Sequence, residues 1–167
     1  MKKGLVSPKE LKELYEKDFA LWAELNAQLL REKAYEFVDW ENLLEEIEDM
    51  GRSKLDACIS YLAVIMEHLY KYEHLRHMVY GGRERGGRGW IKSIANSRLA
   101  IRSILRRNPS LKVKLPLELE SAWEDAKDAL RVWLELNGRK AEDFRIPEKC
   151  PYTFEQVMEY EPWKKEE

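Results

Sequence analysis

A chain of 167 residues is long enough to bury the core of one domain, and its 44% hydrophobic and 11% aromatic residues exclude a disordered chain. The net charge of −2 and the pI near 6.0 are not those of a dedicated nucleic-acid-binding protein. No apolar run approaches the roughly 18 residues of a membrane span, and the first ten residues lack the apolar region of a signal peptide.

The two cysteines, Cys58 and Cys150, lie far apart in unlike contexts. Such a pair is more typical of a reduced protein than of a disulfide framework. We therefore expect a cytoplasmic protein without a membrane segment.

The small net charge hides an asymmetry along the chain. Residues 1–70 carry 9 basic and 15 acidic groups, residues 71–107 carry 10 and 2, and residues 108–167 carry 10 and 14. The differences are −6, +8 and −4, which sum to −2. The basic middle segment either attracts an anionic partner or neutralises its acidic neighbours within the fold, and we favour the second interpretation.

Helix signals follow one another from the start of the chain. Ser7, Pro8 and Glu10 form a capping box with proline at the first helical position, which predicts a helix to about Arg31. Asp39 can cap a second helix that ends near Gly51. A third helix then runs from Ser53 to about Tyr80, unless one continuous helix crosses Gly51.

The second half of the chain continues the helical pattern after a glycine–arginine loop at 81–89. We expect a fourth helix at 90–107, a fifth from Pro116 to about Asn137, and a short last helix behind the capping box of Thr153 and Gln156. The predicted fold is therefore all-α: an up-and-down bundle of four to five main helices plus a short C-terminal helix. We expect a single domain over residues 1–167, with the third helix in its centre because that helix is apolar around most of its circumference.

Two charged residues fall where leucines are expected. Arg98 projects between Ile91 and Leu105 on the fourth helix, and Asp18 projects within the leucine stripe of the first. A buried guanidinium needs a carboxylate or carbonyl partner, so we predict an ion pair between Asp18 and Arg98.

Further polar residues lie at or near the apolar faces of the second and third predicted helices. Either they fix the register of the helices, or they line a pocket that binds a ligand or a metal such as Mn or Fe. No regular helix brings His68, His74 and His77 to one metal, so we assign no metal ligand, and any cofactor stays open. The candidate polar cluster consists of Asp18, Glu45, Glu48, His68 and Arg98.

A candidate anion-binding segment follows the third helix. Its basic side chains lie near Tyr80 and Trp90, which could stack on bases, although no known nucleic-acid-binding motif is present. Its residues are Arg83, Arg85, Arg88 and Lys92.

Several blocks together resemble a known family: 15–22, 42–53, 68–71, 108–111 and 147–152, with Trp90, Ile94 and Arg98 between them. In this order and spacing, over about residues 14–163, the chain resembles the bacterial family known as domain of unknown function 29. Tyr70 departs from the Leu-Leu-Lys that often follows the histidine in that family. The resemblance implies an all-helical fold and brings no established activity, cofactor or catalytic residue.

Three functions remain open at this point. The first is a non-catalytic helical binding or adaptor module with a protein partner. The second is an enzyme or a ligand- or metal-binding protein that uses the polar cluster. The third is nucleic-acid contact through residues 83–107. Whether the chain is an enzyme, and whether it forms oligomers, the sequence leaves undecided.

Overall fold

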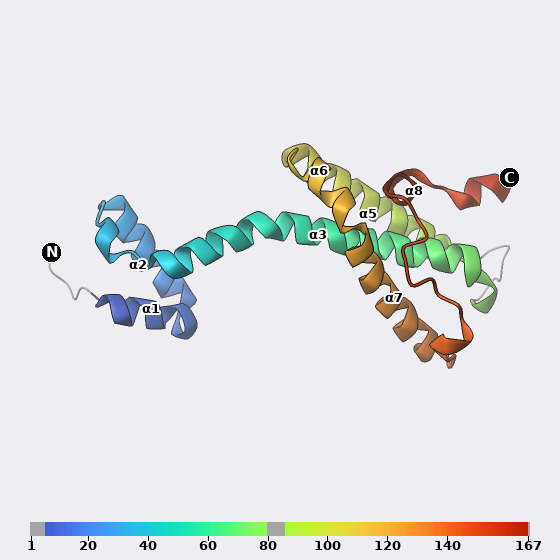
Figure 1. The fold of residues 1–167 in the computed structure, drawn as a ribbon, viewed down its shortest axis with the longest axis horizontal. Coiled ribbons are helices and arrows are strands. Elements are labelled where there is room, and N and C mark those ends of the chain that lie inside the picture. Colours follow the sequence, from blue (N-terminus) through green and yellow to red (C-terminus); the bar gives the residue numbers. More distant parts are fainter. Residues whose placement is uncertain (1–5, 80–85, 167) are drawn as a thin grey trace. The chain divides into compact units, whose positions relative to one another are not determined.

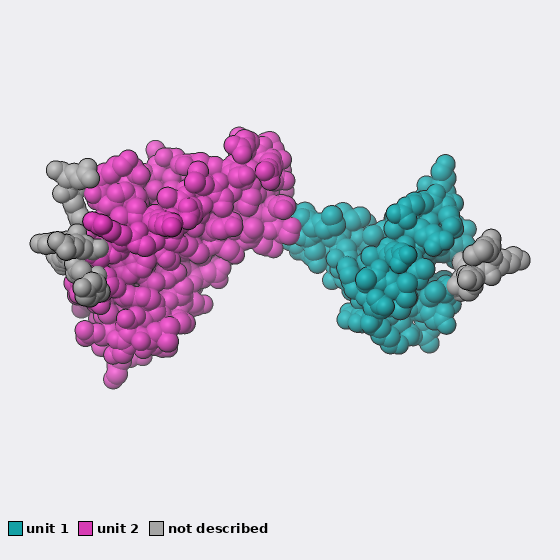
Figure 2. All heavy atoms as spheres, turned by 180° about the vertical axis from the view of Figure 1, so that it is seen from behind, with its two compact units in different colours: residues 1–52 teal, residues 53–167 magenta. Residues whose placement is uncertain are grey.

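The computed structural model describes residues 6–79 and 86–166, and these residues form helices and turns without any strand. The predicted all-α class is confirmed. The chain divides into two compact units, unit 1 (Met1–Arg52) and unit 2 (Ser53–Glu167), and each is described by itself (Figure 2). Within the described residues, no helix combines the length and the apolar character that a bilayer crossing requires.

Unit 1 begins with two helices where one was expected. Ser7 and Glu10 form the predicted capping box of α1 (Pro8–Lys17), and α2 covers Phe19–Arg31 (Figure 1). The helix breaks at Asp18, whose φ of −154° is not helical and whose side chain accepts a hydrogen bond from the backbone N of Leu21. The prediction of one continuous helix to Arg31 is therefore wrong, because Asp18 acts as the N-cap of a second helix.

A polar network joins α2 to the start of α3 (Trp40–His74) after the short 3-10 turn η1 (Tyr35–Phe37). The Asp39 carboxylate accepts hydrogen bonds from Trp22 Nε1 at 2.9 Å and from Asn42 Nδ2 at 2.7 Å. Buried Asn26 accepts the backbone N–H of Asp39 and donates to the carbonyl of Trp22, both at 2.9 Å. The network satisfies the buried polar groups at this junction and sets where α3 begins.

The α3 helix has 35 residues and passes through Gly51 without interruption. Of the two alternatives that the sequence left open, the continuous helix is the observed one. Gly51 does not adopt the positive φ of a C-cap glycine, whereas Gly138 does after α7. The long helix supplies the last turns of unit 1 and the first element of unit 2.

Unit 2 is a helical bundle built on the C-terminal half of α3. Its short 3-10 turns are η2 (Arg76–Met78), η3 (Leu115–Glu118), η4 (Ala141–Asp143) and η5 (Pro162–Glu166). Its other helices are α5 (Arg88–Arg107), α6 (Leu111–Lys114), α7 (Leu119–Leu136) and α8 (Phe154–Glu159) (Figure 1).

Three helices supply most of the core of unit 2. The largest fully buried side chains include Leu62, Ile65 and Leu69 of α3, Ile94 and Ile101 of α5, and Trp123, Leu130 and Leu134 of α7. The expected helix at Pro116 starts instead as the 3-10 turn η3, and the α-helix follows from Leu119. Gly138, at φ +70°, ends α7 as predicted.

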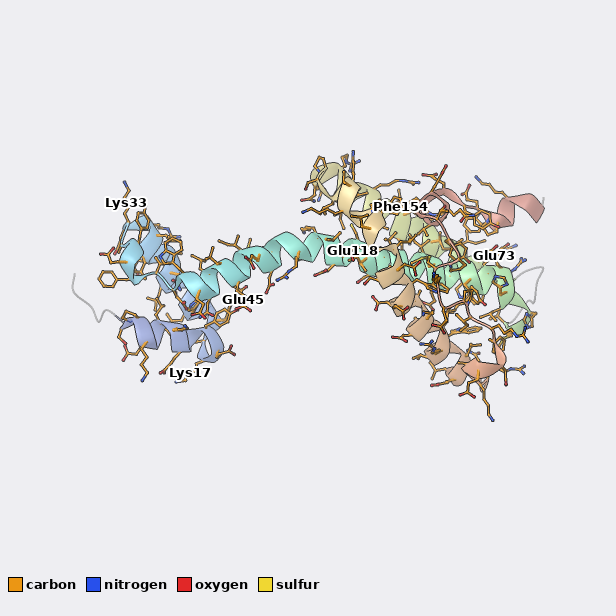
Figure 3. The ribbon with its side chains drawn as sticks, viewed as in Figure 1. Lys17, Lys33, Glu45, Glu73, Glu118 and Phe154 are labelled. Atoms are coloured by element: carbon orange, nitrogen blue, oxygen red, sulfur yellow. The ribbon has the colours of Figure 1, made fainter. Side chains whose placement is uncertain are left out.

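The C-terminal segment is held on the bundle by polar side chains. Trp123 Nε1 donates to the carbonyl of Pro147 at 2.9 Å, and buried Lys127 donates to the carbonyl of Glu148 at 2.9 Å. Glu73, near the C-terminal end of α3 (Figure 3), accepts hydrogen bonds from the hydroxyls of Tyr152 at 2.8 Å and Tyr160 at 3.0 Å. These bonds give residues 145–153, which have little regular structure, and the α8 helix after them a defined place.

Candidate functional site

Three members of the predicted polar cluster lie exposed in unit 1. Asp18 caps α2, while Glu45 and Glu48 stand on the first turns of α3, where Figure 3 labels Glu45. The expectation that Asp18 is buried for a pair with Arg98 is wrong, because a residue that caps a helix end does not follow the wheel of an uninterrupted helix. Glu45 and Glu48 likewise do not contribute to a buried cluster.

Arg98 is buried in unit 2 with 5% of its surface exposed, and carbonyl oxygens rather than a carboxylate accept its hydrogen bonds. Its guanidinium donates to the carbonyls of Val157 at 2.9 Å, Tyr160 at 2.7 Å and Gln156 at 3.4 Å. Burial lowers the pKa of Arg98, and the nearby Glu161 and Glu159 carboxylates oppose this shift. Arg98 thus satisfies carbonyls at the C-terminal end of α8, where a helix leaves acceptors unpaired.

A different charged group lies near His68. Lys71, only 4% exposed, pairs with Glu67 one turn earlier on α3. Its ammonium lies 4.8 Å from the ring centroid of Trp133 and 5.8 Å from that of Trp90. An ion pair plus two cation–π contacts compensates the burial of this lysine.

His68 faces the backbone of its own helix. Its Nδ1 lies 2.8 Å from the carbonyl oxygen of Val64 and 3.8 Å from the Glu67 carboxylate. Because a carbonyl only accepts, Nδ1 carries the proton in this contact. Burial lowers the pKa of His68, opposed by Glu67 and assisted by Lys71. The ring thus bonds to the backbone of the preceding turn of α3.

In the described part of the chain, no three His, Cys, Asp or Glu side chains lie close enough together to hold a metal ion. The cysteines are free thiols, and burial raises the pKa of both Cys58 and Cys150. Their sulfurs are therefore less reactive than an exposed thiol.

The predicted anion-binding residues are only partly covered by the structure. Arg83 and Arg85 lie outside the described residues, whereas Arg88 and Lys92 are exposed on the first turns of α5. No acidic residue occurs in α5. Arg88 also lines a hollow of about 410 Å³ beside Trp90 and Trp133. Anion binding at this segment stays a prediction.

An exposed apolar surface on unit 1 was not anticipated from the sequence. The described part of unit 1 buries only three apolar side chains: Leu11, Trp22 and Val38. Eight large apolar side chains of the same unit are exposed: Phe19, Leu21, Tyr35, Phe37, Trp40, Leu44, Ile47 and Met50. Unit 2, with more than twice as many described residues, exposes six such side chains: Tyr61, Leu99, Val113, Leu117, Val132 and Leu136.

Three of these side chains form a line along α3. Trp40, Leu44 and Ile47 follow at offsets of four and three residues, which places them on one face of a helix. Asn42 lies about 200° around the helix from Leu44 and is buried in the network with Asp39. The line therefore points away from the face of α3 that binds α2, and Leu44 and Ile47 remain 53% and 54% exposed.

Acidic residues border this line. Glu41, Glu45 and Glu48 project about 40–100° from the Leu44 direction, along one side of it. Glu41 pairs with Lys12 of α1, and Glu45 and Glu48 are exposed. The exposed carboxylates of Glu45 and Glu48 are thus neighbours of an apolar surface rather than members of a buried cluster. The sequence does contain a signal for this apolar surface: Trp40, Leu44 and Ile47 are spaced to share one helix face, opposite the polar Asn42.

Comparisons with known proteins give one match. No curated protein and no solved structure matches the chain. The model of the family described as Domain of unknown function DUF29 matches residues 14–163, nearly the whole chain and both units. The chain therefore belongs to the DUF29 family.

Proposed function

We propose that this protein is a non-catalytic helical module that binds another protein through the exposed apolar residues of unit 1. The observation that carries the proposal is the imbalance within that unit, eight exposed large apolar side chains against three buried ones. Many exposed large apolar side chains on a small folded unit are typical of an interaction site. Covering such side chains removes apolar area from water, at about 25 cal/mol per Å² before the costs of association.

The contacts in unit 2 support a structural rather than a catalytic role for its charged residues. Arg98 is engaged with carbonyls, Lys71 with Glu67 and two tryptophans, and Lys127 with Glu124 at 2.7 Å and the Glu148 carbonyl at 2.9 Å. Each cation thus has a partner that explains its burial. The proposal further places the protein in the cytoplasm, supported by the two free thiols.

Site-specific photo-crosslinking tests the proposal in cells of the source organism. A benzophenone amino acid at Leu44 should form an adduct with one protein, while the same group at Leu136 should not. Leu136, on α7 of unit 2, is the matched control because it is also leucine, also helical and 82% exposed.

The adduct protein is then purified and its affinity for the full chain is measured. Leu44→Glu should weaken binding about 30-fold, the loss expected of a hot-spot residue worth about 2 kcal/mol, and Leu136→Glu should leave it unchanged. Equal affinity of both variants, or no adduct at Leu44, would contradict a docking role for this surface.

A further inference from the structure

Gly51 lies inside the 35-residue α3, away from both helix ends, although no contact within the described residues requires a glycine there. It is exposed, has no positive φ, and a Cβ added to it would meet no heavy atom within 4 Å beyond the backbone of its own stretch of helix. A glycine inside a helix costs about 1 kcal/mol relative to alanine. The packing of the described chain does not explain this cost, so its reason is to be sought outside the chain.

The position of Gly51 on the helix indicates what approaches it. It follows Ile47 by four residues and therefore extends the line of Trp40, Leu44 and Ile47 on the outward face of α3. The distance between two packed helices depends on the side chains at their contact, and a glycine there permits the shortest one. Apolar anchors followed by a glycine on one helical face fit a second helix laid across α3.

Charge identifies the chemistry of that helix. The described residues of unit 1, 6–52, contain 13 acidic and 6 basic side chains, and Glu45 and Glu48 border the line. A second copy that docked with the same surface would bring its own Glu45 and Glu48 against these carboxylates, because a two-fold interface pairs identical patches. A partner with lysines or arginines beside its apolar positions complements the acidic border instead.

We propose that the line of Trp40, Leu44, Ile47 and Gly51 is the docking site for a basic amphipathic helix of another protein. This inference rests on the proposed function and adds the shape and the charge of the partner to it. The apolar positions of the helix cover Leu44 and Ile47, its basic flank meets Glu45 and Glu48, and Gly51 lets its backbone approach α3.

A pair of synthetic peptides tests the charge of the partner. Both peptides are helical with leucines at i, i+3 or i+4, and i+7, and one carries lysines on its flanks where the other carries glutamates. Fluorescence anisotropy against the full chain should give about tenfold tighter binding of the lysine peptide, and the difference should shrink in high salt because the flanking charges are exposed. Equal binding of the two peptides would overturn the basic partner.

Glycine variants test the close approach. Gly51→Leu should weaken binding of the lysine peptide about tenfold, while Gly51→Ala should raise the melting temperature because alanine favours the helix. If Gly51 served only the fold, Gly51→Leu would not weaken peptide binding while Gly51→Ala raised the melting temperature. Gly89→Leu is the matched control: Gly89 is an exposed helical glycine of α5 in unit 2, and an added Cβ there also meets nothing within 4 Å.

The remaining outcomes separate this inference from the proposed function. Unchanged peptide binding by Gly51→Leu, with the Leu44 adduct still formed, overturns the helix-docking geometry and leaves a protein-binding surface. Sedimentation that shows a dimer of the unmodified chain, abolished by Gly51→Leu, makes a second copy the occupant and overturns the inference. If the protein binds neither peptide and no adduct forms at Leu44, the proposed function itself is contradicted.

Discussion

Charged side chains in this protein are buried only where a specific acceptor meets them. Arg98 donates to the carbonyls of α8, Lys71 lies between Glu67 and two indole rings, and Lys127 contacts Glu124 and the 148 carbonyl. The burial of Arg98 could be anticipated from its position between Ile94 and Ile101 on one helix face. Its partners could not, because carbonyls about 60 residues later in the chain carry no mark in the sequence.

Replacing Arg98 should destabilise unit 2 substantially. Arg98→Met should lower the free energy of unfolding on the order of 3 kcal/mol, because the carbonyls of Val157 and Tyr160 lose a charged donor. Chemical denaturation followed by circular dichroism measures this. Arg106→Met, on an exposed turn of the same helix, should change stability by less than about 0.5 kcal/mol. Similar losses in both variants would mean that the carbonyl contacts contribute little.

At the scale of elements, polar junctions decide where helices stop and start. Asp18 splits the predicted first helix into α1 and α2, and Asp39 with Asn26 and Trp22 holds α2 against the start of α3. Both aspartates are recognisable N-cap residues, and Asp39 was predicted as one. Asp18 was misread because it also fits the leucine wheel of one longer helix. Gly51 shows the opposite case, since a possible stop signal is crossed by a continuous helix.

The junction at Asp39 should be sensitive to substitution. Asp39→Ala removes the acceptor of Trp22 Nε1 and of Asn42 Nδ2, so we expect a loss on the order of 2 kcal/mol in the stability of unit 1. This loss of stability is measured by urea unfolding of a variant in which the fluorescence of Trp22 reports on unit 1. Asp39→Asn keeps an acceptor oxygen and should therefore lose less stability than Asp39→Ala. If alanine and asparagine behaved alike, the hydrogen bonds would not set this junction.

For the whole molecule, the two units differ in how they are stabilised. The buried core cluster lies entirely within unit 2, whereas unit 1 buries three apolar side chains and depends more on its polar network and on aromatic contacts such as Tyr15 with Trp22, 5.0 Å between ring centroids. Few buried apolar contacts are typical of a region that opens more readily than a well-packed core. The unit that carries the proposed docking surface is thus also the one that gains most from a partner.

Hydrogen exchange should show this difference directly. Backbone amides of α2 should exchange about tenfold faster than those of α7, because opening unit 1 exposes less apolar surface. Mass spectrometry of peptides from the intact protein gives both rates in one experiment. Binding of the lysine peptide should slow exchange in unit 1 and leave α7 unchanged. Equal protection of α2 and α7 in the free protein would contradict the difference in core.

The helical class, the capping boxes at Ser7 and Thr153, the end of α7 at Gly138 and the family could all be read from the amino-acid sequence, because they depend on residues close together in the chain or on the order of motifs. Which polar residues are buried, and which apolar residues are exposed, could be learned only from the folded chain. Glu45 and Glu48 are exposed, Lys71 is buried, and Leu44 and Ile47 face outward although their spacing is that of a core stripe. Helical periodicity defines a face, but whether that face is covered depends on elements distant in the sequence. On α3 the covered face is the one with Asn42, whereas the face with Leu44 and Ile47 stays exposed.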